Sequence, residues 1–88
     1  MELKDKKVII TGISKGIGKH TCLQLLEKGA QVCGWGLNEP DYSDPKLNFI
    51  KTDVKDFESV TKAYSKTEEI WGEGADVLIN NVGYGLFN

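Results

Sequence analysis

Residues 8–18 read VIITGISKGIG, and this stretch decides how the chain begins to fold. The β-branched run Lys7–Thr11 predicts a short buried strand that ends at Gly12. From Gly16 onward, apolar side chains recur at the spacing of one helix face, which predicts a helix of about three turns that ends before Gly29. The stretch therefore encodes a strand, a tight glycine turn and a helix in direct succession.

The rest of the chain continues the alternation of strands and helices. Further strands are predicted at residues 31–35, 47–52 and 76–80, and a second long helix is predicted to start after a cap at Asp56 and to end at the glycines at positions 72 and 74. A polar loop at residues 36–45 stands where a crossover helix would be expected. We expect an α/β fold, a doubly wound parallel sheet of about four strands with two to three helices.

Composition and charge indicate a globular domain. The 88 residues fit one domain, and 40% hydrophobic with 27% charged residues is ordinary for a folded chain. A net charge of −2 with scattered lysines argues against a nucleic-acid partner. No apolar run approaches the ~20 residues needed to span a membrane, and the charged start contains no secretory signal, so we expect a cytoplasmic location.

The cysteines and the lone histidine give no sign of a metal site. Cys22 and Cys33 are eleven positions apart, which matches neither a redox pair nor a zinc-ligand spacing. His20 has no second imidazole beside it anywhere in the chain. We expect two small buried core residues and a histidine on the helix surface.

The glycine turn suggests a phosphate site. A glycine at the strand end permits the tight turn, a second allows backbone to approach a pyrophosphate, and a third allows the helix to pack closely on the sheet. The helix N-terminus then offers unpaired N–H groups to an anion. A tight strand-to-helix connection without a ligand would use the same glycines, so the turn alone leaves both interpretations open.

Three motifs in register give the chain a family resemblance. The TGxxxGxG spacing of Gly12, Gly16 and Gly18 resembles that of the short-chain dehydrogenase/reductase family. The pair Asp53–Val54 is similar to the family's Asp-Val pair at the adenine ring, and residues 80–83 (NNVG) resemble its NNAG segment with Val for Ala. The resemblance implies a Rossmann-type sheet, with residues 1–88 as the N-terminal part of a single NAD(P)-binding domain whose catalytic half is absent.

The resemblance also implies which residues meet the cofactor. We expect contacts from Gly12, Ser14, Lys15, Gly16, Ile17, Gly18, Leu37, Asp53, Val54, Asn81 and Gly83. We expect Asn80 to be structural, whereas Asn81 and Gly83 are the preferred contacts beyond the fourth strand.

The end of the second strand bears on which dinucleotide is used. Folds that prefer NAD usually place Asp or Glu there, where it binds the ribose 2′-hydroxyl. Here the corresponding position falls near Gly36, followed by Leu37 and Asn38, and no carboxylate occupies it. Lys15 stands where a basic residue of the family commonly faces a 2′-phosphate. We predict NADP(H), with NAD as the alternative because a loop shift could bring Glu39 to the ribose.

The family's chemistry needs Ser, Tyr and Lys residues that lie beyond the NNAG segment. The chain ends five residues after Gly83, so we expect it to be inactive alone and its parent to interconvert an alcohol and a carbonyl. Tyr42 and Lys46 have the YxxxK spacing, but Pro45 between them breaks the helix that catalysis would require. Tyr64, four positions before Glu68, is predicted to face the core.

Two further expectations concern partners. The alternative to an oxidoreductase fragment is a non-catalytic module that binds a dinucleotide, or merely a partner, without turnover. The fourth predicted strand, residues 76–80 (DVLIN), would form an edge of the sheet with unpaired N–H and C=O groups, so we also expect self-association.

Overall fold

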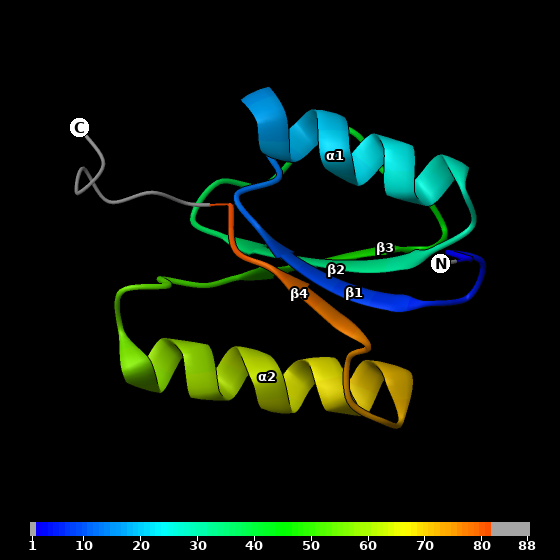
Figure 1. Cartoon of the computed structure of the whole chain (residues 1–88). Coiled ribbons are helices and arrows are strands. Elements are labelled where there is room, and N and C mark those ends of the chain that lie inside the picture. The colour runs from blue at the N-terminus through cyan, green and yellow to red at the C-terminus, as the bar shows by residue number, and fades with distance from the viewer. Residues whose placement is uncertain (1, 82–88) are drawn as a thin grey trace.

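A computed structural model describes residues 2–81, which form a four-stranded sheet with one helix on each face (Figure 1). Its elements are β1 (Lys7–Thr11), α1 (Gly16–Glu27), β2 (Gln31–Gly36), β3 (Leu47–Lys51), α2 (Phe57–Trp71) and β4 (Val77–Ile79). All strand pairs are parallel, and the strand order is β3-β2-β1-β4. The predicted doubly wound parallel sheet is confirmed, with two helices in the described part of the chain.

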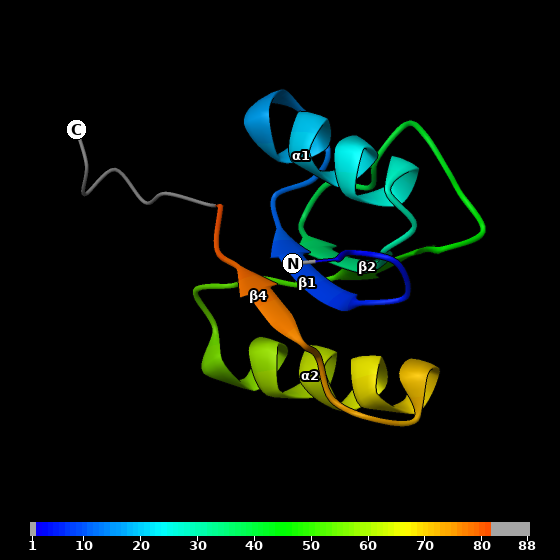
Figure 2. The ribbon, with the colours of Figure 1, turned by 45° about the vertical axis from the view of Figure 1, so that its right-hand side comes forward.

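The order in which strands are added to the sheet reverses direction at β1. The chain adds β2 and β3 on one side of β1 and then returns to place β4 on the other side. α1 covers one face of the sheet and α2 covers the opposite face, as the two views show (Figures 1 and 2). In such sheets, ligands bind in the crevice outside the carboxyl ends of the strands at this reversal. The topology therefore points to the ends of β1 and β4.

The core consists of two layers, one on each face of the sheet. Because side chains alternate along a strand, Val8 and Ile10 pack with α1, whereas Ile9 packs on the face that carries α2. This two-sided burial explains why β1 is a continuous apolar run. Cys22 and Cys33 are fully buried, one in each layer, as the sequence predicts.

The helix α2 begins and ends as predicted, but one side chain that is predicted to face the core is exposed. The Asp56 carboxylate accepts a hydrogen bond from the Glu58 N–H at 3.1 Å, and Gly72 ends the helix with a φ of 75°. The prediction that Tyr64 faces the core is wrong, because 41% of this residue is exposed. Ala63 and Thr67 are buried instead, since small side chains let the helix approach the sheet closely.

The strand β4 pairs only with β1 among the described residues. Val77 is opposite Val8 and Ile79 is opposite Ile10, while Leu78 between them is 62% exposed. The strand is thus an edge within residues 2–81, as the sequence predicts. No helix in this part of the chain combines the length and the hydrophobicity needed to cross a membrane.

Candidate functional site

A cleft of about 420 Å³ lies at the carboxyl ends of the strands. Its lining comes from four short segments, each of which directly follows a strand: residues 12–15 after β1, residues 36–38 at the end of β2, residues 52–55 after β3, and Asn81 after β4. A volume in this range is typical of small-molecule and cofactor sites. The cleft lies where the topology predicts a ligand.

Glycine is favoured at each of the three positions of the turn, but not for the same structural reason at each. Gly12 and Gly16 have φ values of 73° and 64°, a left-handed conformation that residues with side chains rarely adopt. Gly18 is needed for packing, because a Cβ on it would overlap the carbonyl oxygen of Gly12 and lie 2.6 Å from Nδ2 of Asn81. The third glycine therefore lets α1 start directly against the turn and against the segment after β4.

The N-terminus of α1 is open to an anion. Lys15 occupies the cap position in an extended conformation, no described side chain caps the helix, and its first turn contains no acidic residue. At α2, by contrast, Asp56 caps the helix and Glu58 stands in the first turn. Because the first N–H groups of a helix have no partner within it, the α1 terminus can receive a negatively charged group beside the cleft.

The segment after β4 is tied to the glycine turn. The backbone N–H of Asn81 donates to Oγ1 of Thr11 at 2.9 Å, and its side-chain amide donates to the Gly12 carbonyl at 3.2 Å. Thr11 Oγ1 also donates to Oδ1 of Asn80 at 3.2 Å. Asn80 is thus structural as predicted, and Asn81 both lines the cleft and holds the turn in place.

The segment after β3 forms the opposite wall. The Lys55 N–H donates to Oδ1 of Asp53 at 3.0 Å, and the Asp53 N–H donates to Oγ of Ser59 at 2.9 Å. These bonds shape the turn from β3 into α2 and place Asp53 and Val54 on the lining. One carboxylate oxygen of Asp53 is therefore engaged in this turn, and the side chain remains half-buried at the cleft.

The end of β2 carries no carboxylate into the cleft. Gly36 ends the strand, and Leu37 and Asn38 continue the lining. A Cβ on Gly36 would have only ordinary contacts, the nearest being the Gly12 nitrogen at 3.8 Å. Glu39 belongs to a neighbouring hollow that it shares with Tyr42 and residues of β3.

The structure brings together most of the cofactor-contact residues expected from the sequence. The cleft lining contains Gly12, Ser14, Lys15, Leu37, Asp53, Val54 and Asn81. Gly16, Ile17 and Gly18 form the first turn of α1 and are not in the lining, and Ile17 is 77% exposed. Gly83 lies outside the described residues. Sequence reasoning missed Ile13, Gly36, Asn38, Thr52 and Lys55, although each neighbours an expected contact in the same strand-end segment.

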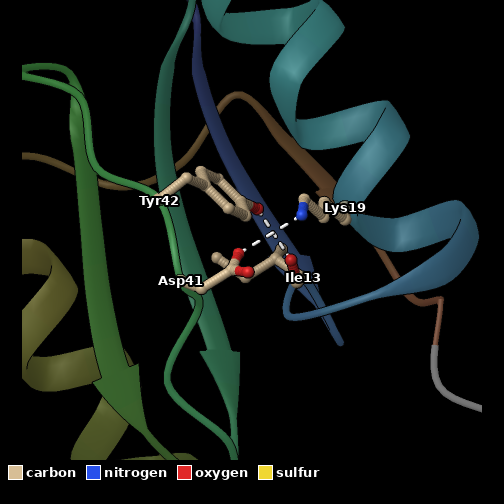
Figure 3. A network of polar contacts seen from close by, with 4 residues as sticks. All are labelled: Ile13, Lys19, Asp41 and Tyr42. Carbon is tan, nitrogen blue, oxygen red and sulfur yellow. Dashed lines mark hydrogen bonds and ion pairs between the residues drawn. The ribbon is translucent and has the colours of Figure 1, made fainter.

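Tyr42 contacts the glycine turn through a hydrogen bond, although it does not line the cleft. The loop between β2 and β3 contains no helix, and Tyr42 donates a hydrogen bond from its phenol to the Ile13 carbonyl at 2.7 Å (Figure 3). Burial, together with the nearby Cys22 thiol, raises the pKa of Tyr42 above its ordinary value. The phenolic proton is donated to the Ile13 carbonyl, and Tyr42 is not among the residues that line the cleft.

Comparison with known sequences agrees with this geometry. The family described as short chain dehydrogenase matches residues 6–88. Farnesol dehydrogenase from Aedes aegypti is 33% identical over 88 residues, covering 89% of this chain and 36% of that protein. The 3-oxoacyl-[acyl-carrier-protein] reductase FabG from Vibrio cholerae is 33% identical over 89 residues, covering 94% of this chain and 36% of that protein.

Solved structures of similar proteins have the same fold in this region. A short chain dehydrogenase from Leptospira borgpetersenii with bound NAD+ superimposes with a TM-score of 0.86 at 26% identity, over 99% of this chain and 35% of that one. One from Burkholderia cenocepacia in complex with NADP gives a TM-score of 0.82 at 26% identity, over 94% and 34%. The chain therefore spans about a third of the length of the proteins it matches, 36% in the two sequences above.

Proposed function

Because the chain belongs to the short-chain dehydrogenase family, we propose that it forms the dinucleotide-binding part of an oxidoreductase that uses NADP(H) to interconvert an alcohol and a carbonyl. The observation that carries this proposal is the cleft at the strand ends, which has the uncapped N-terminus of α1 beside it. The family's NAD+ and NADP complexes are consistent with a dinucleotide in this position.

The proposed pyrophosphate site is the turn between β1 and α1. The residues there fit an anionic group, since Gly12 and Gly16, which the positive φ angles favour, have no side chains to block its approach, and Lys15 adds a positive charge. The partial positive charge at the start of α1 acts in the same direction. The adenine side of the dinucleotide would lie between Leu37 and Val54, which form apolar parts of the lining.

NADP(H) is favoured over NAD by the charges near the end of β2. A 2′-phosphate at this position would meet no carboxylate from Gly36, Leu37 or Asn38, and Lys15 also lines the cleft. Glu39, the residue that would favour NAD, contributes to the neighbouring hollow instead. Asp53 is the acidic residue of the lining, but it follows β3 and one of its oxygens already accepts the Lys55 N–H.

The bound nicotinamide would donate the hydride in carbonyl reduction and accept it in alcohol oxidation, and this chain's residues would bind and orient the cofactor. Farnesol dehydrogenase and the FabG reductase are relatives whose names describe alcohol oxidation or carbonyl reduction, which supports the same reaction class here. The 88 residues by themselves are proposed to bind the dinucleotide without turnover, because neither Tyr42 nor Tyr64, the tyrosines among residues 2–81, lines the cleft.

Calorimetric titration of the full natural protein with NADPH and NADH tests the proposal. We expect NADPH to bind about tenfold more tightly than NADH, since a tenfold ratio corresponds to about 1.4 kcal/mol, which is close to the contribution of one hydrogen bond to a charged group. Equal or tighter binding of NADH would overturn the choice of cofactor. Binding without any alcohol or carbonyl turnover would favour the non-catalytic module.

A further inference from the structure

The loop between β2 and β3 is fastened to the start of α1 by three contacts. Besides the 2.7 Å hydrogen bond from Tyr42 to the Ile13 carbonyl, Nζ of Lys19 pairs with the Asp41 carboxylate at 3.2 Å. The same Nζ lies 5.5 Å from the centre of the Tyr42 ring. Figure 3 shows the four residues between the loop and the helix, with Ile13 taking part through its backbone carbonyl. We refer to these contacts of Ile13, Lys19, Asp41 and Tyr42 as the loop tether.

Ile13 is held from its side chain as well as from its carbonyl. The residue is 1% exposed, and a Cβ on Gly34 would overlap the Ile13 side chain, so the absence of a side chain at Gly34 makes room for it. The side chain is thus seated on β2 while the carbonyl accepts the Tyr42 phenol. With both ends held, the peptide unit between Ile13 and Ser14 has little freedom to rotate.

That peptide unit belongs to the wall of the cleft. Its N–H is that of Ser14, and in a trans peptide this N–H points opposite to the preceding carbonyl. Ser14 and Lys15 both line the cleft. We propose that Tyr42 is a positioning residue for the dinucleotide, because its bond to the Ile13 carbonyl fixes the direction in which the Ser14 N–H is presented.

The loop tether also connects two walls of the cleft. Leu37 and Asn38 begin the loop whose later residues Asp41 and Tyr42 reach α1, whereas Ser14 and Lys15 precede that helix. The pairing of β1 with β2 is one link between these two walls. The loop tether is a second link, because it holds the loop against the start of α1. The proposed role rests on the proposed function, since it assigns Tyr42 to the binding of that same dinucleotide.

The variant Tyr42→Phe tests the role in the full natural protein. It removes the phenolic oxygen but keeps the ring that packs against the core and receives Lys19. We expect the dissociation constant and the KM for NADPH to rise about five- to tenfold, the equivalent of one net hydrogen bond, while kcat at saturating NADPH stays within about twofold. Tyr64→Phe, the same change on the exposed side of α2, is the matched control and should alter neither constant.

A purely structural role for Tyr42 would give another pattern. The unfolding temperature of the variant would fall while the dissociation constant, measured well below that temperature, would equal that of the wild type. This outcome would overturn the inference but leave the proposed function standing. Failure of the wild-type protein to bind either dinucleotide would instead overturn the proposed function and the inference together.

Asp41→Asn provides a second test if Tyr42→Phe does not fold. This change releases Lys19 from its pair and makes the site more positive, so simple electrostatics would strengthen the binding of an anion. If the ion pair with Lys19 is what keeps the neighbouring Tyr42 in position, its loss would loosen the bond from Tyr42 to the Ile13 carbonyl and weaken binding. A larger dissociation constant for NADPH in Asp41→Asn supports the inference, and an equal or smaller one contradicts it.

Discussion

The side-chain amide of Asn81 donates a hydrogen bond to the Gly12 carbonyl across 3.2 Å, although the two residues are 69 positions apart in the chain. The bond joins the segment after β4 to the turn after β1, so two neighbouring strand ends hold each other in place. A Cβ on Gly18 would intrude on both partners. The conformation of the glycine turn therefore depends on contacts with the segment after β4 and with the start of α1, and not on its own residues alone.

The two glycines at the start of α1 should respond differently to alanine. Gly18→Ala would place a methyl group on the Gly12 carbonyl and should lower the free energy of unfolding by about 3 kcal/mol through overpacking. Gly16→Ala has open space and only the strain of its φ of 64°, so the loss should be about 1 kcal/mol. Urea unfolding of both variants measures the difference, and equal losses would show that the Gly18 contact is not rigid.

Lys15 should contribute to cofactor selection. Lys15→Ala is expected to raise the dissociation constant for NADPH about tenfold and that for NADH by a smaller factor, because only NADPH carries the 2′-phosphate. The matched control is Lys28→Ala, which removes the same charge at the opposite end of α1. Titration at two salt concentrations checks the assignment, since the Lys15 effect should shrink as salt rises. If Lys15→Ala and Lys28→Ala had similar effects, the cause would be the change in net charge and not a contact between Lys15 and the 2′-phosphate.

A carboxylate at the end of β2 should reverse the preference for the dinucleotide. Gly36→Asp is compatible with the local geometry, because the nearest atom to an added Cβ is the Gly12 nitrogen at 3.8 Å. The new charge would repel a 2′-phosphate and accept a hydrogen bond from a ribose hydroxyl. We expect the ratio of NADPH to NADH affinity to fall by about tenfold to a hundredfold. Glu39→Gln, in the neighbouring hollow, should leave this ratio unchanged, and a shift there would place Glu39 at the ribose.

The buried cysteines should make the fold sensitive to alkaline pH. Desolvation raises the pKa of Cys22 and of Cys33 above the value in the unfolded chain. Above about pH 9 the unfolded chain releases these protons while the folded chain keeps them, so the unfolded state gains stability. The free energy of unfolding should thus be fully retained below pH 9 and decline as the pH rises further.

Urea unfolding at a series of pH values measures this decline. Replacing Cys22 and Cys33 by alanine should make it less steep, with the remainder contributed by Tyr42 and Lys7, whose pKa values are also raised. In the native protein both thiols should resist alkylation at pH 8, since burial blocks access and keeps them protonated. An alkaline decline that is unchanged in the alanine variant would rule out the cysteines as its source.

The edge strand β4 should promote self-association of the isolated 88 residues. Leu78 is 62% exposed on a strand that pairs only with β1 in the described part of the chain. Leu78→Lys places a charge on this edge and should shift the sedimentation of the chain toward the monomer. The control Ile70→Lys removes a comparably exposed apolar residue from α2, at 46%. A wild-type chain that stays monomeric at high concentration would contradict the expectation.

The order of the elements, the parallel sheet, the glycine turn and most of the residues that line the cleft could be predicted from the amino-acid sequence. These features are local: strand and helix periods, a cap such as Asp56 and the backbone freedom of Gly12 are set by residues a few positions apart. The segments with expected contacts also follow strands, so the rule that parallel strands bring their carboxyl ends together was enough to group them.

The side chains that hold that turn in place, and the burial of Ala63 rather than Tyr64 on α2, could not be predicted from the sequence because they depend on tertiary packing. The contacts of Asn81 with Gly12 and of Tyr42 with Ile13 join residues 69 and 29 positions apart, and no local pattern encodes such a pairing. For α2, both Tyr64 and Ala63 fit an apolar stripe, and the close approach of the helix to the sheet selected the smaller side chain. These outcomes depend on how the packed layers fit together, which a linear pattern of residue types does not specify.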